Sequence, residues 1–201
     1  VLSITSSDTG EATVTSSLTF TSANWDTAQT VTVTGVDDHL VDGTETTTLT
    51  VAVVDVASDN NFDGVADQTV SVSTTDDDVA GFTIVELEGS TTVDESGSTD
   101  TFTVVLNAQP DSDVVVAITS SDTGEASSNS PLTFTSSNWD TPQTVTVTGV
   151  DDFVIDGTIT SDLVVAIVDA SSDNNFDAVA DQTVSVSTTD DDAAGFTVTE
   201  T

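Results

Sequence analysis

TVTVTGVDD at Thr30–Asp38, which returns unchanged at Thr144–Asp152, decides the fold class. Valine and threonine alternate strictly in it, so one face of the segment is apolar and the other is polar. That period of two is typical of an antiparallel strand with one buried and one solvated face. Gly, and the two Asp residues that come one position later, are turn signals. The stretch therefore predicts a β-strand that ends in a loop carrying two carboxylates.

The recurrence extends over most of the chain. SDNNFD at Ser58–Asp63 returns at Ser172–Asp177, and about 60 of the 80 comparable positions are identical at a constant offset of 114 residues. We therefore predict a complete repeat at Gly81–Ala194, a repeat lacking its first strands at 1–80, and the start of a third repeat at 195–201. Because both ends then fall within a repeat, we expect an excerpt from a longer array.

A period of 114 residues has the length of one autonomous domain. The complete repeat contains seven alternating or β-branched runs separated by Gly, Pro, Asn, Asp and Ser, and no window sustains an apolar period near 3.6. This pattern predicts an all-β fold, an antiparallel β-sandwich of the immunoglobulin-like type. The runs are Phe82–Val85, Thr101–Leu106, Val114–Thr119, Leu132–Thr135, Thr144–Val150, Leu163–Val168 and Thr183–Ser187.

Two further expectations concern the core: which aromatic residues fill it, and what the lack of the first strands means for the 1–80 segment. Trp25 and Trp139, with Phe20, Phe62 and their counterparts Phe134 and Phe176, are expected to anchor the sandwich cores. Without its first strands, the 1–80 segment would have an open edge that promotes aggregation or accepts a strand from a neighbouring molecule.

The charge balance excludes several classes of partner. The chain has 29 Asp and 7 Glu but no Lys, Arg or Cys, for a formal net charge of −36. Nucleic acids and anionic membranes are bound mainly through Lys and Arg, so we expect neither as a partner, and no segment is apolar enough to insert into a membrane. His39 is the only histidine and Phe153 replaces it in the other copy. We therefore expect no enzymatic activity.

The positions of the acids are informative. If consecutive strands alternate in direction, four acidic segments of the complete repeat meet at one end of the sandwich. They carry Asp94 and Glu95, Asp122 and Glu125, Asp151, Asp152 and Asp156, and Asp190, Asp191 and Asp192. These carboxylates would repel one another strongly, and only cations from solution can neutralise them. Oxygen ligands without His or Cys favour Ca²⁺, whereas the alternative is a solvated acidic surface.

A second acidic loop has alternating oxygen ligands. Asp59-x-Asn61-x-Asp63-Gly64 followed by Asp67 matches the first half of an EF-hand-type calcium loop, but Val70 stands where the closing Glu belongs. In the second copy Ala178 replaces the Gly. The corresponding acids and amide there are Asp173, Asn175, Asp177 and Asp181. Such strings also form ordinary Asx turns, so both interpretations stay open.

Five motifs resemble the Calx-beta domain family: VDESG at Val93–Gly97, SDTGEA at Ser7–Ala12, LTF, TVTVTGVDD and DGTET at Asp42–Thr46. The resemblance implies a β-sandwich that binds Ca²⁺ at one pole, as in the regulatory domains of sodium–calcium exchangers. Residue by residue, it implies ligands at Asp8, Asp37, Asp38, Asp42, Glu45, Asp76, Asp77, Asp78, Glu95, Asp122, Asp151, Asp152, Asp156, Asp190, Asp191 and Asp192. Ile159 stands at the place of Glu45 in the second copy, so one ligand is lost there.

Tandem copies of this kind also look like those in very long secreted bacterial adhesins and surface fibres. We therefore expect calcium-stabilised spacer repeats at the cell surface or outside the cell. Their partners would be neighbouring repeats of the same chain and identical chains in a fibre, and shared Ca²⁺ at Thr75–Gly81 would stiffen the joint. The alternatives are a lectin-like or adhesive module, whose surface would include the divergent segment Thr13–Ser17, and an accessory region of a secreted enzyme.

Overall fold

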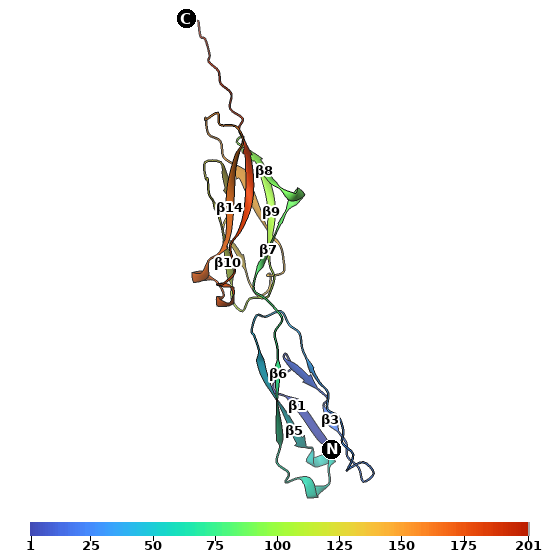
Figure 1. Cartoon of the computed structure of the whole chain (residues 1–201). Coiled ribbons are helices and arrows are strands. Elements are labelled where there is room, and N and C mark those ends of the chain that lie inside the picture. Colours follow the sequence, from blue (N-terminus) through green and yellow to red (C-terminus); the bar gives the residue numbers. More distant parts are fainter. Residues whose placement is uncertain (201) are drawn as a thin grey trace. The chain divides into compact units, whose positions relative to one another are not determined.

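The computed structural model describes residues 1–200, except for the side chain of Glu88. The chain divides into two compact units, Val1–Asp77 (unit 1) and the residues from Asp78 onward (unit 2). Both consist of β-strands with short 3₁₀ turns (Figure 1). Among the described residues, no helix is long and apolar enough to cross a membrane.

Unit 2 has two facing sheets, ordered β12-β10-β14-β15-β8 and β11-β13-β9-β7. All neighbouring strands are antiparallel except β15 and β8, which are parallel. The strands are β7 (Phe82–Glu86), β8 (Thr91–Asp94), β9 (Thr99–Leu106), β10 (Val114–Ser120), β11 (Ala126–Ser128), β12 (Leu132–Phe134), β13 (Gln143–Gly149), β14 (Ile159–Ile167) and β15 (Gln182–Thr189). The 3₁₀ turns are η3 (Leu87–Gly89), η4 (Asp169–Ser171) and η5 (Asn174–Phe176). The predicted all-β antiparallel sandwich is confirmed, with two short strands, β8 and β11, that the pattern did not indicate.

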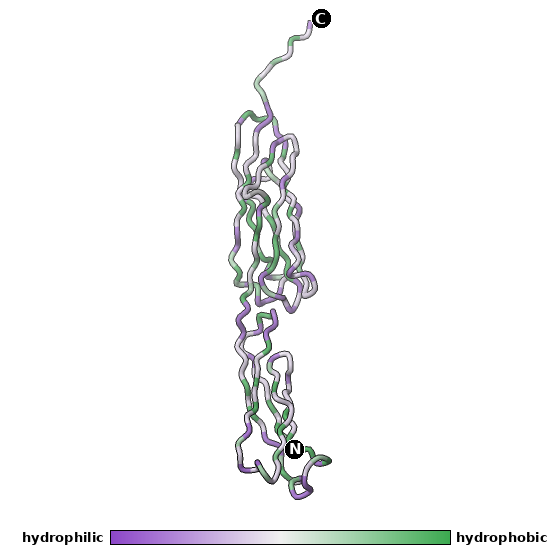
Figure 2. Tube along the Cα trace, turned by 90° about the vertical axis from the view of Figure 1, so that its right-hand side faces the viewer, coloured by the Kyte–Doolittle hydropathy of each residue, from purple (hydrophilic) through white to green (hydrophobic). Residues whose placement is uncertain are grey.

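The core of unit 2 lies between the two sheets. Val145 and Val147 of the TVTVTG strand are fully buried, and Val145 stands opposite the buried Phe102 of β9. In Figure 2 the apolar stretches follow the strands of the unit. Burying a side chain of this size contributes about 1.5–3 kcal/mol, so the alternation sets which face of β13 turns inward.

Gly149 ends β13 where another chain segment comes very close. A Cβ atom at this position would overlap the carbonyl oxygen of Asp94 at the end of β8. The Gly149 N–H also donates a hydrogen bond to the Ser98 carbonyl at 3.0 Å. Gly149 thus lets the β8–β9 turn, which carries Glu95, pack closely against the end of β13, and its N–H bonds to that turn.

Unit 1 repeats these elements 114 residues earlier in the chain. Its sheets are ordered β3-β1-β5-β6 and β2-β4. The elements are β1 (Leu2–Ser6), β2 (Ala12–Val14), β3 (Ser17–Leu18), β4 (Val33–Gly35), β5 (Glu45–Val53), η1 (Asp55–Ala57), η2 (Asn60–Phe62) and β6 (Gln68–Thr74). Counterparts of β7, β8 and β9 would precede residue 1, and no described strand of unit 1 takes their place.

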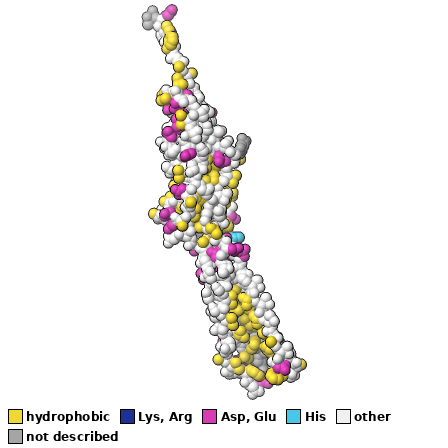
Figure 3. Space-filling model, in the orientation of Figure 1, with side chains coloured by type: hydrophobic (Ala, Val, Ile, Leu, Met, Phe, Trp, Pro, Cys, Tyr) yellow, Lys and Arg dark blue, Asp and Glu magenta, His cyan; other side chains and the backbone are white. Residues whose placement is uncertain are grey.

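Unit 2 buries two of the three expected core aromatics and half-buries the third, Trp139, whereas the counterparts in unit 1 are exposed. Phe134 and Phe176 are fully buried, whereas their counterparts Phe20 and Phe62 are exposed, and Trp25 is 71% exposed. Figure 3 shows apolar side chains gathered in a patch on the face of unit 1 that is turned to the viewer. The expectation that Trp25, Phe20 and Phe62 anchor a core is therefore wrong for the described residues of unit 1, which include no counterparts of the strands β7, β8 and β9.

Candidate metal centre

Four loops of unit 2 deliver carboxylates to one end of the sandwich. They are the β8–β9 turn with Glu95, the β10–β11 loop with Glu125, the β13–β14 loop, and the segment after β15. The ends of β8 and β15 lie side by side because these two strands are parallel, and the antiparallel pairs bring the other two loops to the same end. Glu95 belongs to two groups whose carboxylate oxygens lie within 4.8 Å of one another: one with Asp152 and Asp192, the other with Glu125 and Asp156.

Glu95 is the central side chain of this cluster. It is 1% exposed, and neither of its carboxylate oxygens has a hydrogen-bond partner among the described residues. Its backbone N–H donates to the Thr189 carbonyl at 3.1 Å, which fixes the turn beside the end of β15. Oε2 of Glu125 and Oδ2 of Asp192 are likewise buried without a described partner. A buried, unpartnered carboxylate is costly, so these atoms are the strongest sign of an ion.

The cluster changes the acidity of its members. Burial, and then repulsion from Asp190 and the neighbouring acids, raises the pKa of Glu95 to about 7. Burial, followed by repulsion from Asp156, also raises the pKa of Glu125. The pKa of Asp192 is raised by burial and then by Asp190. Without Lys or Arg in the sequence, only a proton or a cation from solution relieves this repulsion.

The donor set fits a hard divalent cation. Five carboxylates converge, and the sequence has no Cys and only one His, which lies in unit 1. Ca²⁺ accepts six to eight oxygen ligands at about 2.3–2.6 Å in variable geometry, whereas Zn²⁺ and copper favour nitrogen and sulfur. Glu95, Glu125, Asp152, Asp156 and Asp192 are the side chains that would hold it.

Asp190 has a different role from the one the sequence indicated. Its Oδ2 accepts the N–H groups of Asp156 at 3.1 Å and Gly157 at 2.9 Å, and its Oδ1 accepts the N–H of Asp192 at 2.7 Å. These bonds, with Gly157 first, lower the pKa of Asp190. Gly157 has a φ of 79°, which suits glycine. Asp190 therefore holds two ligand-bearing segments together.

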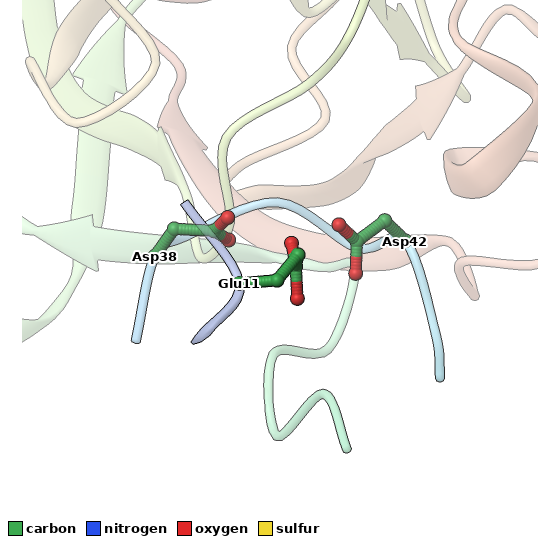
Figure 4. Close-up of side chains that lie close together, drawn as sticks. All are labelled: Glu11, Asp38 and Asp42. Carbon is green, nitrogen blue, oxygen red and sulfur yellow. The ribbon is translucent and has the colours of Figure 1, made fainter. Parts of the chain in front are cut away.

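Unit 1 has a smaller version of the cluster. The carboxylates of Glu11, Asp38 and Asp42 face one another, with oxygens within 4.8 Å (Figure 4). They correspond to Glu125, Asp152 and Asp156, and the place of Glu95 would precede residue 1. Burial, then repulsion from Asp42, raises the pKa of Glu11, and burial, then Asp38, raises that of Asp42.

Other bonds in unit 1 match those of unit 2. Asp76 Oδ2 accepts the Gly43 N–H at 2.9 Å, as Asp190 does for Gly157. Carboxylate oxygens of Asp37 and Asp77 lie within 4.8 Å of each other, as the sequence indicated for this pole.

Some of the predicted ligands lie in the close groups of carboxylates described above, and others do not. Several lie outside the close groups of described carboxylates: Asp8, Glu45, Asp76, Asp122, Asp151, Asp190 and Asp191. Asp8 and Asp122 instead accept the N–H of Gly10 and Gly124 at 2.9 and 3.0 Å, closing Asx turns. Sequence reasoning placed Glu125 at this pole but assigned the ligand to Asp122, and it assigned Asp8 rather than Glu11, although each Glu stands three residues after the aspartate in SDTGEA.

The second acidic loop forms capped turns. Asp59 and Asp173 each accept the N–H of the asparagine two residues later, Asn61 or Asn175, at 2.9 Å. Asp173 is buried and also accepts the Ser112 N–H at 2.9 Å. No close group of three described acids includes a residue of these loops, to which Asp63, Asp67, Asp177 and Asp181 also belong. The observed bonds are those of an Asx turn.

Comparison with known proteins gives distant structural neighbours only. No family model matches the chain, and no curated protein matches it. Domains 4 and 5 of the S-layer protein SbsC share 17% identity at a TM-score of 0.44, over 94% of this chain and 70% of that one. The longer rSbsC(31-844) shares 17% identity at a TM-score of 0.42, over 93% of this chain and 20% of that one. The apo-form Calx CBD1 domain shares 16% identity at a TM-score of 0.39, over 55% of this chain and 98% of that one.

Proposed function

We propose that this chain is a calcium-stabilised structural spacer of a cell-surface or secreted protein. One observation carries the proposal: Glu95 is 1% exposed, its two oxygens have no described hydrogen-bond partner, and four other carboxylates surround it in a chain without Lys or Arg. Without a bound metal ion, this end of unit 2 carries a high density of negative charge. With Ca²⁺ bound, the same oxygens would join four loops and would thereby hold both sheets together at that end.

The burial of the cluster favours a structural role over catalysis. A general acid or nucleophile must contact its substrate, and Glu95 and Glu125 are 1% and 5% exposed. Their raised pKa values follow from burial and mutual repulsion, which a bound cation removes. We therefore propose that the clustered acids act as ligands and that the chain has no enzymatic activity.

An extracellular setting would supply the ion that the proposed role requires. Extracellular calcium modules bind with dissociation constants of about 10⁻⁴–10⁻³ M, so they need the calcium concentrations found outside cells. An ion bound only by the folded state stabilises it by about 2.7 kcal/mol at a hundredfold excess over the dissociation constant. A chain with a net charge of −36 gains further because Ca²⁺ reduces its internal repulsion.

The test is titration calorimetry of the 201-residue chain with Ca²⁺ and with Mg²⁺, together with thermal unfolding in Ca²⁺ and in chelator. We expect saturable Ca²⁺ binding, weaker Mg²⁺ binding, and a higher unfolding temperature of unit 2 in Ca²⁺. The matched control is Asp140→Asn, which removes an exposed acid outside the close groups and should change neither result. Equal unfolding temperatures in Ca²⁺ and chelator would refute the proposal.

A further inference from the structure

The sequence contains three Asp–Gly pairs, in which an aspartate side chain precedes an unhindered main-chain nitrogen. They are Asp42–Gly43, Asp63–Gly64 and Asp156–Gly157. In such a pair the glycine nitrogen can attack the aspartate carboxyl carbon, because glycine has no side chain in the way and reaches backbone conformations that other residues rarely adopt. All six residues are exposed, so exposure alone would make the three pairs equally reactive.

A carboxylate holds the glycine N–H in two of the three pairs. The Gly43 N–H donates to Oδ2 of Asp76, and the Gly157 N–H donates to Oδ2 of Asp190, both at 2.9 Å. Before it attacks, the nitrogen must lose this proton and turn away from its acceptor. A hydrogen bond to a charged acceptor is among the stronger ones, and a neighbouring negative charge disfavours a nitrogen that has lost its proton. These two pairs are therefore protected.

The third pair has no such acceptor. Gly64 lies in the turn after η2, and its N–H donates no main-chain hydrogen bond to a described residue. The described side-chain hydrogen bonds of this loop involve Asp59, Asn61 and Gln68 but not Asp63. A Cβ atom at position 64 would meet nothing within 4 Å. Both reacting groups of this pair are thus accessible and unrestrained.

Unit 2 contains a matched loop without the glycine. Its pair is Asp177–Ala178, and Asp177 has a φ of −59° and a ψ of −28°, against −60° and −26° at Asp63. Asp177 and Ala178 are also exposed, although β7, β8 and β9 are present in unit 2. The exposure of this position therefore does not depend on those strands. The pairs differ in the methyl group of Ala178, which hinders the approach of the nitrogen.

We propose that Asp63–Gly64 is a site of spontaneous isoaspartate formation, and that Asp76 and Asp190 protect the other two Asp–Gly pairs from it. In the first step the Gly64 nitrogen attacks Cγ of the Asp63 carboxyl group in its protonated form. The N–Cγ bond forms, the bond from Cγ to the hydroxyl oxygen breaks, and that oxygen leaves as water with the former amide proton. The product is a cyclic succinimide. The step needs a local opening of an exposed turn, which is among the least costly motions of a folded chain.

Water from the solvent then opens the ring. Addition at Cγ breaks the new N–Cγ bond and restores aspartate. Addition at the main-chain carbonyl carbon of Asp63 instead breaks its bond to the Gly64 nitrogen, so that the main chain passes through Cβ and Cγ and the α-carboxylate becomes the side group. One water molecule is lost and one is gained, so no oxidant, reductant or further reactant takes part.

The protected pair and the reactive pair of unit 1 lie at opposite ends of the β5–β6 hairpin. Glu45 stands opposite Thr74 at the end near Asp42, and the turn with Asp63 joins the other ends of these strands. Asp42 and Asp156 belong to the acidic clusters. Isoaspartate lengthens the main chain by a carbon atom and displaces the carboxylate, so at Asp156 it would move a ligand of the proposed Ca²⁺ site. That consequence rests on the proposed function, whereas the reactivity of Asp63 does not.

The experiment incubates the 201-residue chain for several weeks in warm, mildly acidic buffer with chelator. A methyltransferase specific for isoaspartate labels the product, and peptide mass spectrometry locates the label. We expect the label to accumulate at Asp63 at least tenfold faster than at Asp42 or Asp156. Gly64→Ala should slow it at least tenfold, and Ala178→Gly should create a new label at Asp177 at a rate similar to that of Asp63.

The protection is tested in the same way. Asp190→Ala frees the Gly157 N–H and should raise the rate at Asp156 at least tenfold. Asp190→Asn keeps an acceptor oxygen and should restore most of the protection, and the matched control Asp191→Ala, at an exposed acid outside the close groups, should change nothing. If Asp190→Ala unfolds this end of unit 2, which circular dichroism would show, Asp76→Ala provides the same test in unit 1.

Several outcomes would overturn the proposal. Equal rates at the three Asp–Gly pairs would show that the carboxylates give no protection, and no label at Asp63 would remove the site. A label at Asp63 without one at Asp177 in Ala178→Gly would show that the pair in its turn is not the cause. Because all incubations contain chelator, a failure of the chain to bind Ca²⁺ would leave these rates as expected, so the two proposals fail separately.

Discussion

Glu95 and Asp192 bring carboxylate oxygens within 4.8 Å of each other, from the turn after β8 and the segment after β15. Both side chains have buried oxygens without a described hydrogen-bond partner. β8 and β15 are parallel neighbours, so their ends lie side by side and this pair forms directly from the sheet topology. A divalent cation between them would join the last strand to the first part of the same unit.

The stability of metal-free unit 2 should decrease as the pH rises from about 4.5 to about 7. Glu95 has a pKa of about 7 in the folded state and an ordinary value of 4.5, so the folded state binds the proton that the unfolded state releases in this range. Glu125 and Asp192, with raised pKa values, act in the same direction, whereas the lowered pKa of Asp190 acts only at more acidic pH. Thermal unfolding in chelator measures the slope, which Glu95→Gln should flatten.

Calcium affinity should have the opposite dependence on pH. Because the ion competes with the proton on Glu95, apparent affinity should rise between about pH 5 and pH 7 and level off above it. Calorimetric titrations at three pH values measure this. An affinity that does not change with pH would show that the ion does not displace a proton from Glu95.

Glycine should be required at position 149 but not at position 35. Gly149→Ala places a methyl group against the Asp94 carbonyl and should destabilise unit 2 by about 1–3 kcal/mol or more. Gly35→Ala meets only Thr74 Cγ2 at 3.6 Å and should change the stability of unit 1 little. Denaturant unfolding of both variants makes the comparison. A similar loss in the two variants would contradict the difference between the units.

Matched substitutions should separate the two acidic clusters. Glu125→Gln removes a buried ligand from the group that contains Glu95, whereas Glu11→Gln removes its half-buried counterpart from a group of three. We expect the first to reduce Ca²⁺ affinity by at least tenfold and the second to affect only a weaker site. Titration calorimetry distinguishes them. A larger loss with Glu11→Gln would contradict the assignment of unit 2 as the stronger site.

Sequence patterns were sufficient for the sandwich and for the end at which the acids gather. Period-two alternation specifies a strand and its buried face, and strand parity then brings Asp152 and Asp192 to one end. The alternation of strand directions does not show which carboxylates accept hydrogen bonds from backbone N–H groups. Asp122 and Asp190 therefore matched a ligand pattern although hydrogen bonds to backbone N–H groups engage them, while Glu125 supplies the carboxylate.

Burial depends on partners that a local pattern does not contain. Phe20 and Phe134 lie in nearly identical sequence, yet only the second is buried, because the described residues include β9 and the segment after it for unit 2 but no counterparts for unit 1. The parallel pairing of β8 with β15 was likewise not predictable from alternation, which indicates a strand but not its neighbour.

The most direct test of the calcium account compares Glu95→Gln with the unsubstituted chain by thermal unfolding of unit 2, in chelator and in saturating Ca²⁺. Glutamine keeps the shape of the side chain but removes the buried charge. The account predicts a crossover: in chelator the variant unfolds at a higher temperature than the original chain, because repulsion is relieved, and in Ca²⁺ it unfolds at a lower one, because a ligand is lost. The same rank order of the two proteins in both solutions would contradict it.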